Sequence, residues 1–272
     1  MNILDRFRLD GKVAVVTGGG RGIGRGIALA FAEAGADVAI GARRKYEVDI
    51  VAEEIRAIGQ KAFSMEIDVL QEENIENFAK ETAKKLGGIS IWINNAGGNT
   101  DRTPRKLVDT PEEVWDTLID LNLTSCWHGA RAAVKHMDDQ GGSIVNIISG
   151  AAWGAAPTFG PYAAAKSGTI SITKTLAIEL SKQKIRVNCV APGLIPTEML
   201  METMNVNEDS VEKMGAGIAA GRVGTPEDIA AACIYLCSEA AAWVTGQTIW
   251  VTGGPLPSTS TLSRLRKERG DD

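Results

Sequence analysis

Short apolar runs alternate with longer amphipathic segments along almost the whole chain. The runs are rich in Val and Ile and are apolar at consecutive positions, which is typical of parallel strands covered on both faces. Helical patterns lie between them, among them residues 23–33, 111–137 and 161–181. This alternation predicts an α/β protein with a doubly wound parallel sheet. Seven runs are predicted to be strands, over residues 13–17, 37–41, 62–67, 89–93, 143–148, 185–190 and 247–251.

The continuity of this pattern determines the predicted domain organisation. No linker rich in Pro and Ser divides it and no internal repeat is evident, so we expect one Rossmann-type domain over residues 1–254. Residues 255–272 carry mixed charges, which is typical of a solvated tail. Residues 196–221 interrupt the alternation, and their adaptable methionines suit either a pliable cover over a substrate or a pair of surface helices. These methionines are Met199, Met201, Met204 and Met214.

Composition and charge exclude several classes of protein. The 272 residues are 44% hydrophobic and 23% charged, as in globular domains and unlike disordered chains. The net charge of -5 argues against a nucleic-acid binder that relies on bulk positive charge. No apolar run approaches the roughly 20 residues of a membrane span, and the N-terminal residues lack the apolar core of a secretory signal. We therefore expect a cytoplasmic protein without a membrane partner.

The cysteines and histidines offer little for redox or metal chemistry. Cys126, Cys189, Cys233 and Cys237 are scattered without a C-x-x-C pair, which favours buried free thiols. The chain has only two histidines, which argues against a multi-His metal centre. We therefore expect no metal site.

A glycine-rich turn follows the first predicted strand and opens the first helix. Its sequence is Thr17-Gly18-Gly19-Gly20-Arg21-Gly22-Ile23-Gly24. Glycines permit a tight turn and let the backbone approach a pyrophosphate, and the N–H groups at the helix start attract its negative charge. The pattern T-G-x-x-x-G-x-G between a strand and a helix predicts that the chain binds a dinucleotide.

The end of the second predicted strand indicates which dinucleotide binds. Proteins that select NAD usually place a carboxylate there, on the ribose 2′-hydroxyl. This chain has Arg43, Arg44 and Lys45 instead, and Arg21 in the glycine-rich turn adds a further positive charge. A guanidinium binds a 2′-phosphate through paired donors, so we expect NADP(H), with NAD(H) less favoured. The alternative is that residues 43–45 form a solvated loop.

Tyr162, Lys166 and Ser149 are candidates for handling a substrate oxygen and its proton. Tyr162 and Lys166 are four residues apart at the start of a predicted helix, which puts them on one face. An ammonium group nearby stabilises a tyrosinate. Ser149 follows the strand 143–148, whose end faces the ligand crevice of such a sheet, so its hydroxyl is placed to bond a substrate oxygen.

Jointly these motifs resemble the short-chain dehydrogenase/reductase family, over about residues 9 to 254. The resemblance implies a reversible hydride transfer between NADP(H) and a ketone or secondary alcohol. It also implies a homo-oligomer, a tetramer or a dimer, because long helices such as 115–137 and 161–181 commonly pair between subunits in the family. The matching residues are Thr17 to Gly24, Asn94-Asn95-Ala96-Gly97, Asn122, Ser149, Tyr162, Lys166 and Pro192-Gly193.

The resemblance also implies a role for each site residue. Tyr162 would be the general acid/base, Lys166 would support it and hold the nicotinamide ribose, and Ser149 would orient the carbonyl. Asn122 would hold a water that links Lys166 to solvent, although it could instead cap a backbone break. Asp68 and Val69 would contact the adenine, unless Asp68 is a turn residue. The full set of cofactor residues would be Gly18, Arg21, Gly22, Ile23, Gly24, Arg43, Asp68, Val69, Asn95, Ala96, Gly97, Tyr162, Lys166, Pro192, Gly193, Ile195 and Thr197.

The substrate is the part that the residues constrain least. Trp153 and Phe159 would border its pocket beside Ser149 and Tyr162, which suits a hydrophobic or cyclic, steroid-like ketone. Residues 94–98 and 241–247 are similar to bacterial hydroxysteroid dehydrogenases and nearly as similar to 3-oxoacyl-carrier-protein reductases. A carrier protein would need a basic patch, for which Arg102, Arg105 and Lys106 are candidates unless they form a solvated loop. A nucleotide-sensing binding protein without catalysis is the alternative from another class, and the retained Ser, Tyr and Lys argue against it.

Overall fold

The computed structural model describes residues 2–101, 103–137, 140–198, 201 and 208–255. Within these residues, seven strands form one parallel sheet in the order β3-β2-β1-β4-β5-β6-β7. The predicted fold class, a doubly wound sheet in a single domain, is therefore confirmed. The strands are β1 Val13–Thr17, β2 Asp37–Ala42, β3 Ala62–Glu66, β4 Ile91–Asn94, β5 Gly142–Ile147, β6 Ile185–Pro192 and β7 Thr248–Val251.

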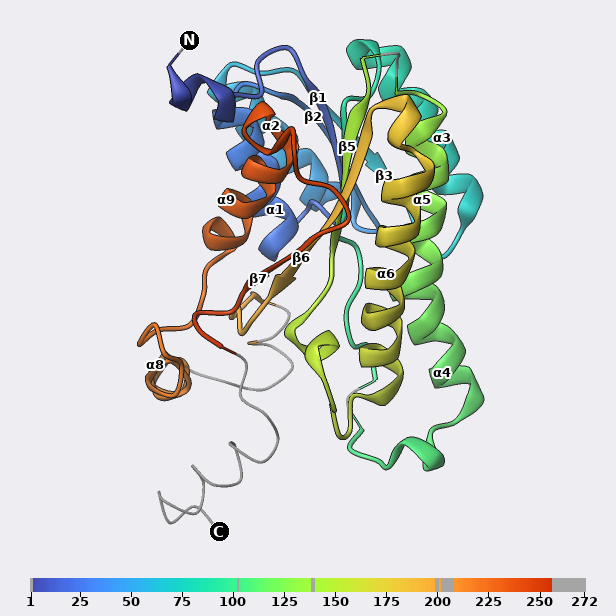
Figure 1. Ribbon diagram of the computed structural model, residues 1–272, viewed down its shortest axis with the longest axis vertical. Helices are drawn as coiled ribbons and strands as arrows, with labels where there is room; N and C mark the ends of the chain where they lie inside the picture. Colours follow the sequence, from blue (N-terminus) through green and yellow to red (C-terminus); the bar gives the residue numbers. More distant parts are fainter. Residues whose placement is uncertain (1, 102, 138–139, 199–200, 202–207, 256–272) are drawn as a thin grey trace.

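Helices cover both faces of the sheet (Figure 1). Helices α1, α2 and α9 pack on one face, and α3, α5 and α6 pack on the other. This arrangement explains why the strands are apolar at consecutive positions, since neither face of the central strands meets water. The helices are α1 Gly22–Glu33, α2 Lys45–Ile58, α3 Glu72–Thr82, α4 Glu112–Ile119, α5 Ser125–Val134, α6 Gly160–Glu179, α8 Glu208–Ala216 and α9 Pro226–Cys237.

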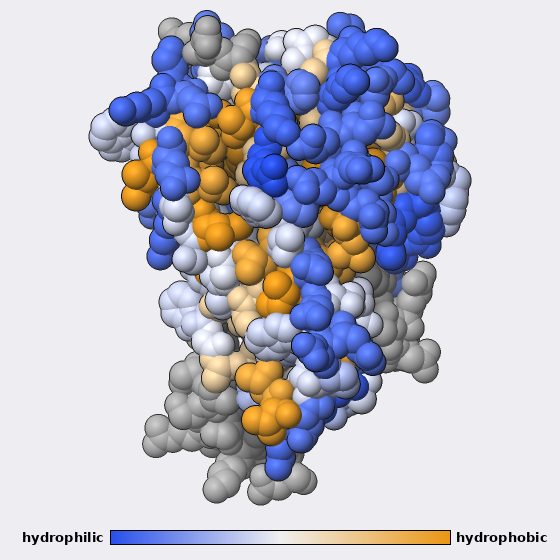
Figure 2. Space-filling model, turned by 90° about the vertical axis from the view of Figure 1, so that its right-hand side faces the viewer, coloured by the Kyte–Doolittle hydropathy of each residue, from blue (hydrophilic) through white to orange (hydrophobic). Residues whose placement is uncertain are grey.

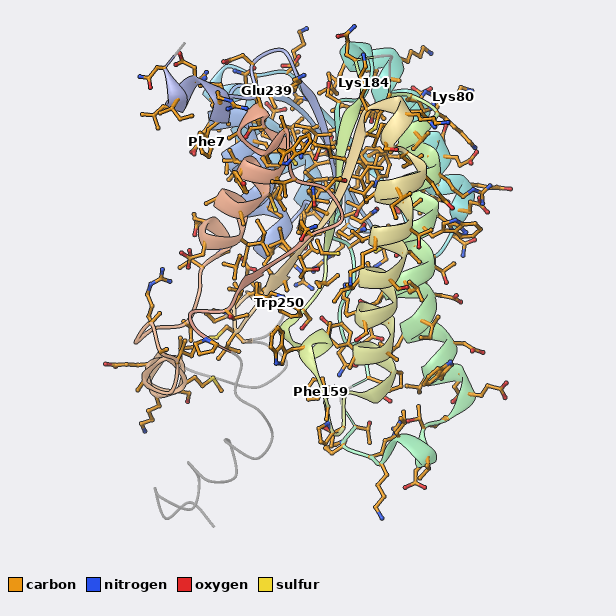
Figure 3. All side chains as sticks on the ribbon, in the orientation of Figure 1. Phe7, Lys80, Phe159, Lys184, Glu239 and Trp250 are labelled. Carbon is orange, nitrogen blue, oxygen red and sulfur yellow. The ribbon has the colours of Figure 1, made fainter. Side chains whose placement is uncertain are left out.

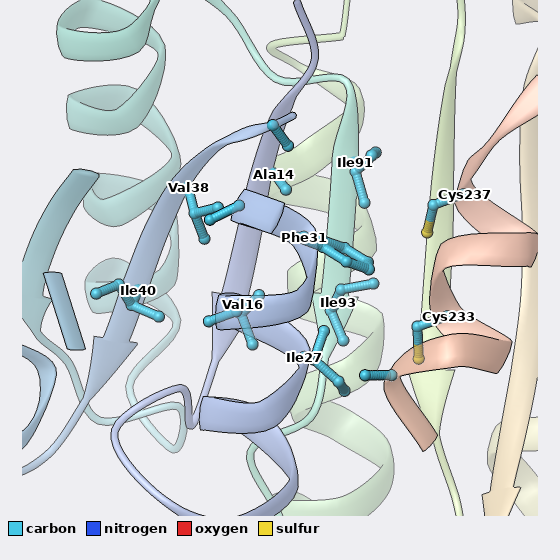
Figure 4. Close-up of a cluster of buried hydrophobic side chains, with 14 of the residues drawn as sticks. Ala14, Val16, Ile27, Phe31, Val38, Ile40, Ile91, Ile93, Cys233 and Cys237 are labelled. Atoms are coloured by element: carbon cyan, nitrogen blue, oxygen red, sulfur yellow. The ribbon is translucent and has the colours of Figure 1, made fainter. Parts of the chain in front are cut away.

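The core between α1 and α9 joins two segments that are far apart in the sequence. Ile27 and Phe31 of α1 point into the apolar cluster that includes Ile93 of β4 and, from α9, Cys233 (Figure 4). Gly26 lies so close to α9 that a Cβ atom on it would be 2.5 Å from the Cβ of Pro226. The glycine therefore permits the approach of α9 to the helix that follows the glycine-rich turn.

The predicted helix 111–137 is interrupted by a π-helical segment. Its α-helical parts are α4 and α5, and Asp120–Thr124 between them is π-helical, as is frequent at functional sites. Asn122 lies in this segment and is fully buried. The segment shifts the face of the helix by about one residue, which a search for helical periodicity does not detect.

The strand order places a crevice at the carboxyl ends of β1 and β4. The chain leaves β1 toward β2 and β3 on one side, then returns to place β4 on the other side of β1. Ligands bind at such a reversal in open α/β sheets. Both the glycine-rich turn after β1 and the residues after β4 lie at this point.

Part of the methionine-rich segment forms a helix. Residues Glu208–Ala216 are helix α8, and Met214 is half-buried in it. Met199 and Met204 lie outside the described residues, as does Arg102 of the possible basic patch. Both predictions for the segment therefore stay open.

Candidate active site

The glycine-rich turn has the backbone that its sequence predicts. Gly18 and Gly22 have φ angles of 67° and 53°, a region that L-residues with side chains rarely adopt. A Cβ on Gly24 would overlap the carbonyl oxygen of Gly18 and lie 2.8 Å from its carbonyl carbon. Arg21 is the N-cap residue of α1, and its side chain does not cap the N–H groups of the first helical turn.

Two side chains fasten this turn to the residues after β4. The Thr17 hydroxyl donates to the carbonyl oxygen of Ile93 and accepts from the backbone N–H groups of Asn95 and Ala96, both at 3.1 Å. The Asn95 amide donates to the carbonyl oxygens of Thr17 and Gly18, at 2.9 and 3.1 Å. The anchoring role of Thr17 was not predicted, because its position before the first glycine indicated only a strand end.

Ser149 lies two residues after β5, and Tyr162 and Lys166 lie near the start of α6. The Ser149 hydroxyl oxygen accepts from the Ala151 N–H at 3.2 Å, as the cap of the 3₁₀ turn Gly150–Trp153. Its own proton is therefore available to a substrate oxygen. Lys166 is 3% exposed and donates from Nζ to the carbonyl oxygen of Ile147 at 2.8 Å. The same Nζ lies 5.8 Å from the ring centroid of Tyr162.

Asn122 connects the π-helical segment to this group. Its amide accepts from the Gly98 N–H at 2.9 Å and donates to the carbonyl oxygens of Gly98 and Leu118, both at 3.0 Å. A Cβ on Gly97 would lie 2.8 Å from Asn122 Oδ1 and 3.2 Å from Lys166 Nζ. Asn122 thus stabilises the loop after β4 and also lies close to the candidate catalytic residue Lys166.

The cations after β2 differ in their partners. Arg44 pairs with Glu47 at 2.9 Å and Lys45 pairs with Asp49, both within helix α2 or at its start. Arg43 is exposed and has no ion pair or hydrogen bond from its side chain to any residue in the described ranges. Among Arg43, Arg44 and Lys45, Arg43 is therefore the residue that no carboxylate in the described part of the chain pairs with.

The loop after β3 holds the two residues predicted near the adenine. Val69 is buried, and Asp68 is half-buried. Asp68 Oδ1 accepts from the Leu70 N–H at 3.0 Å, so this carboxylate also stabilises its own turn. The turn role and an adenine contact are compatible, because a carboxylate has further acceptor positions.

The segment after β6 lies against the first turn of α1. The Gly193 N–H donates to the carbonyl oxygen of Val251 at 2.9 Å, and a Cβ on Gly193 would lie 2.8 Å from Thr252 Cα. Thr197 lies over Gly22, where a Cβ would be 3.0 Å from Thr197 Cγ2. A cavity of about 430 Å³ adjoins this contact; it is lined by Gly22, Arg25, Gly26, Pro196, Thr197, Glu198, Met201, Pro226 and Glu227 and includes none of the three candidate catalytic residues.

Aromatic side chains border the other side of the site. Trp153 is 59% exposed and meets Trp250 of β7 edge to face, with ring centroids 5.0 Å apart. Trp250 and the exposed Phe159 lie on the half of the molecule away from Lys184, which precedes β6 (Figure 3). Trp250 was not predicted as a site residue, because a single aromatic in a strand more often belongs to the core.

The cysteines are buried thiols, as the sequence predicts. All four cysteines are free and buried, and burial raises the pKa of Cys189 to about 11 and that of Cys237 to about 12. No cluster of His, Cys, Asp and Glu that could hold a metal ion occurs among the residues with described structure. No helix in the same part of the chain is long and apolar enough to cross a membrane.

The residues present fit a dinucleotide along the crevice. The start of α1 has no side-chain cap and suits a pyrophosphate, and the absence of a Cβ at Gly97 lets the loop after β4 lie close to Asn122 and Lys166. The exposed Arg43 stands at the end of β2, where the adenosine ribose of a Rossmann protein lies. Lys166 and Asn122 are buried and lie beside Gly97 after β4, where their predicted roles would place the nicotinamide.

Comparisons with known proteins show the family of the chain. A family model described as Enoyl-(Acyl carrier protein) reductase matches residues 18–255. The 7alpha-hydroxysteroid dehydrogenase of Escherichia coli K12 is 36% identical over 251 residues, which cover 92% of this chain and 96% of that protein. The 3-oxoacyl-[acyl-carrier-protein] reductase FabG of Chlamydia pneumoniae is 37% identical over 247 residues, which cover 90% of this chain and 97% of that protein.

Solved structures show the same similarity in three dimensions. A 7 alpha-hydroxysteroid dehydrogenase complexed with NADH and 7-oxo glycochenodeoxycholic acid superposes with a TM-score of 0.86 at 35% identity. The match covers 95% of this chain and 99% of that one. Motifs, fold and relatives agree, and the chain belongs to the short-chain dehydrogenase/reductase family of oxidoreductases.

Proposed function

We propose that the protein transfers a hydride reversibly between NADP(H) and a ketone or secondary alcohol. The observation that carries this proposal is the position of Lys166. Its buried ammonium is tied to the end of β5 and lies one helical turn from Tyr162, beside the strand end that leads to Ser149. Burial of a lysine without a carboxylate partner among the residues described is costly and is typical of a functional group.

Each side chain has a distinct part in the proposed reaction. The bound cofactor supplies or accepts the hydride at its nicotinamide. The Tyr162 hydroxyl gives its proton to the substrate oxygen during reduction and takes it back during oxidation. The Ser149 hydroxyl donates to the same oxygen, and the Lys166 ammonium stabilises the phenolate of Tyr162. Asn122 would hold a water that links Lys166 to solvent, and a proton relayed along this path would restore the Tyr162 hydroxyl after a reduction.

The preference for NADP(H) is based on charge at the adenosine end. Arg43 is exposed and unengaged by any carboxylate in the described ranges, and Arg21 stands at the start of α1. A guanidinium at the end of β2 attracts a 2′-phosphate, whereas NAD-selective proteins have a carboxylate there. The similar hydroxysteroid dehydrogenase structure holds NADH, so this preference depends on the cations of this chain and not on that likeness.

The proposed substrate is a hydrophobic or cyclic, steroid-like ketone or alcohol. The aromatic surface of Trp153, Phe159 and Trp250 supports it, as does the similarity to a hydroxysteroid dehydrogenase. A 3-oxoacyl-carrier-protein reductase is the second candidate, supported by the similarity to FabG. The basic patch that a carrier protein would need is weakened, because Arg105 is paired with Asp101 at 2.5 Å.

We also propose a homo-oligomer in the cytoplasm, as a dimer or tetramer. The outer surface of α4, α5 and α6 exposes Trp115, Trp127 and Ile178, the last to 77%. Figure 2 shows apolar surface interrupting the charged surface on this side of the molecule. A second copy would remove these side chains from water.

A substrate screen tests the proposed reaction. NADPH oxidation is followed by absorbance with steroid ketones, small cyclic ketones and 3-oxoacyl thioesters, and NADH is tested in parallel. Turnover of a cyclic or steroid ketone supports the first candidate, and turnover confined to thioesters supports the second. NADPH binding without oxidation across the whole panel would favour a nucleotide-sensing protein and overturn the proposal.

A further inference from the structure

Gly20, the third glycine of the glycine-rich turn, packs against the first turn of helix α2. A Cβ on Gly20 would lie 2.9 Å from Glu47 Cβ and 3.3 Å from Glu47 Oε2. The Glu47 side chain is only 15% exposed. Its carboxylate therefore lies against the glycine-rich turn, although helix α2 has an exposed side on which a glutamate would be fully solvated.

This carboxylate is held in place by one of the cations after β2. Arg44 Nη2 pairs with Glu47 Oε1 at 2.9 Å, while Arg43 has no carboxylate partner in the described part of the chain. The adenosine end of the crevice thus combines an unpaired guanidinium, a paired guanidinium and a carboxylate. Because like charges repel, the carboxylate opposes a 2′-phosphate held by Arg43, and Arg44 offsets part of this repulsion.

We propose that Glu47 is a specificity-determining residue that reduces the margin by which the protein prefers NADP(H) over NAD(H), and that Arg44 limits this reduction. The inference rests on the proposed use of the crevice for a dinucleotide with its adenosine ribose between β2 and the glycine-rich turn. The inference adds Glu47 of α2 to the cations after β2 as a determinant of cofactor preference. The 2′-phosphate is the one charge by which NADP(H) differs from NAD(H), so NAD(H) binding should be much less sensitive to Glu47.

The test compares dissociation constants of NADPH and NADH, measured from the change in nicotinamide fluorescence on binding. Replacing Glu47 with Gln (Glu47→Gln) keeps the shape and removes the charge. It should tighten NADPH binding about three- to tenfold and change NADH binding less than about twofold. Arg44→Gln leaves the carboxylate unpaired and should weaken NADPH binding by a similar factor. Both effects should shrink as salt is raised, since exposed charges are screened.

Asp49→Asn is the matched control. It removes the same charge from the same helix, but its carboxylate is bound by Lys45 and by Ser64 of β3 at 2.6 Å. It should leave the ratio of the two constants unchanged. The unfolding midpoint of each variant shows that the fold is retained, and Glu47→Ala replaces Glu47→Gln if the latter unfolds.

The two proposals fail in different ways. A wild-type protein that binds NADH more tightly than NADPH overturns the proposed cofactor preference, but it leaves the comparison of Glu47→Gln with wild type intact. Equal tightening of both cofactors in Glu47→Gln, or no tightening of NADPH, overturns the role of Glu47. An equal response of Asp49→Asn overturns it too, because the effect would then be one of net charge.

Discussion

Lys166 Nζ donates a 2.8 Å hydrogen bond to the carbonyl oxygen of Ile147, two residues before Ser149. This bond joins α6 to the end of β5. The bond therefore fixes the start of α6, which carries the candidate residues Tyr162 and Lys166, against the strand end that leads into Ser149. Functional side chains on rigid elements are held more precisely than those on loops.

Replacement of Tyr162 with Phe should abolish turnover and spare cofactor binding. The variant keeps the ring beside Lys166 but lacks the hydroxyl that exchanges a proton with substrate, and general acid/base groups contribute roughly 100- to 10,000-fold. Steady-state rates and NADPH titration measure the two effects separately. Ser149→Ala should lose rate by a smaller factor, and activity of Tyr162→Phe within tenfold of wild type would refute the assignment.

Replacement of Arg43 with Asp should move cofactor preference toward NAD(H). The introduced carboxylate repels a 2′-phosphate and can accept from a 2′-hydroxyl. The ratio of kcat/KM for NADPH and NADH checks this, with Lys45→Gln as a control because Lys45 is already paired with Asp49. An unchanged ratio in Arg43→Asp would show that Arg43 does not contact the 2′-phosphate.

Replacement of Gly24 with Ala should impair the dinucleotide site. The added methyl would overlap the carbonyl oxygen of Gly18, which belongs to backbone and cannot rotate away. We expect loss of cofactor affinity and a lower unfolding midpoint, measured by NADPH titration and thermal denaturation. Gly217→Ala is the control, because the nearest atom to its Cβ is the carbonyl oxygen of Met214 at 3.5 Å, an ordinary contact. Equal behaviour of the two variants would contradict the close packing of the turn.

The ion pair between Arg222 and Asp228 should make stability depend on acid pH. The hydrogen bond from Arg222 holds the pKa of Asp228 at about 2, below its ordinary 3.8. The stabilisation is thus fully present above about pH 4 and is lost as the pH falls toward 2, and partial exposure limits it to about 1 kcal/mol. Urea unfolding of wild type and Asp228→Asn should differ at pH 6 to that extent, with the difference shrinking below pH 4. A constant difference over this range would exclude the ion pair as its cause.

The four cysteines should be unreactive in the folded protein. Cys126, Cys189, Cys233 and Cys237 are buried, and burial raises the pKa of each thiol, which lowers the fraction of reactive thiolate. A colorimetric disulfide reagent should find no fast-reacting thiol in the native state and four in denaturant. Rapid reaction of a native thiol would show that one of these side chains is accessible.

The strands and the placement of Tyr162 and Lys166 on one helix could be predicted because each has a local signature. A strand buried on both faces must be apolar throughout, and Tyr162 and Lys166 share a helix, so their separation follows from its pitch. The π-helical segment around Asn122 could not be predicted, since one added residue barely disturbs the apolar pattern of the helix. The anchoring by Thr17 and the packing of Gly20 against Glu47 depend on how separate elements meet, and the spacing of residues along the chain does not show this.

The packing of Gly26 against Pro226 also has a consequence for folding during translation. Ile27 and Phe31 of α1 are synthesised well before α9, which packs against them and follows β6 in the chain. Helix α1 therefore keeps an uncovered apolar side while the elements up to β6 are being added, and contacts between such distant segments form slowly. A nascent chain should consequently complete the packing around the glycine-rich turn only after α9 has emerged from the ribosome.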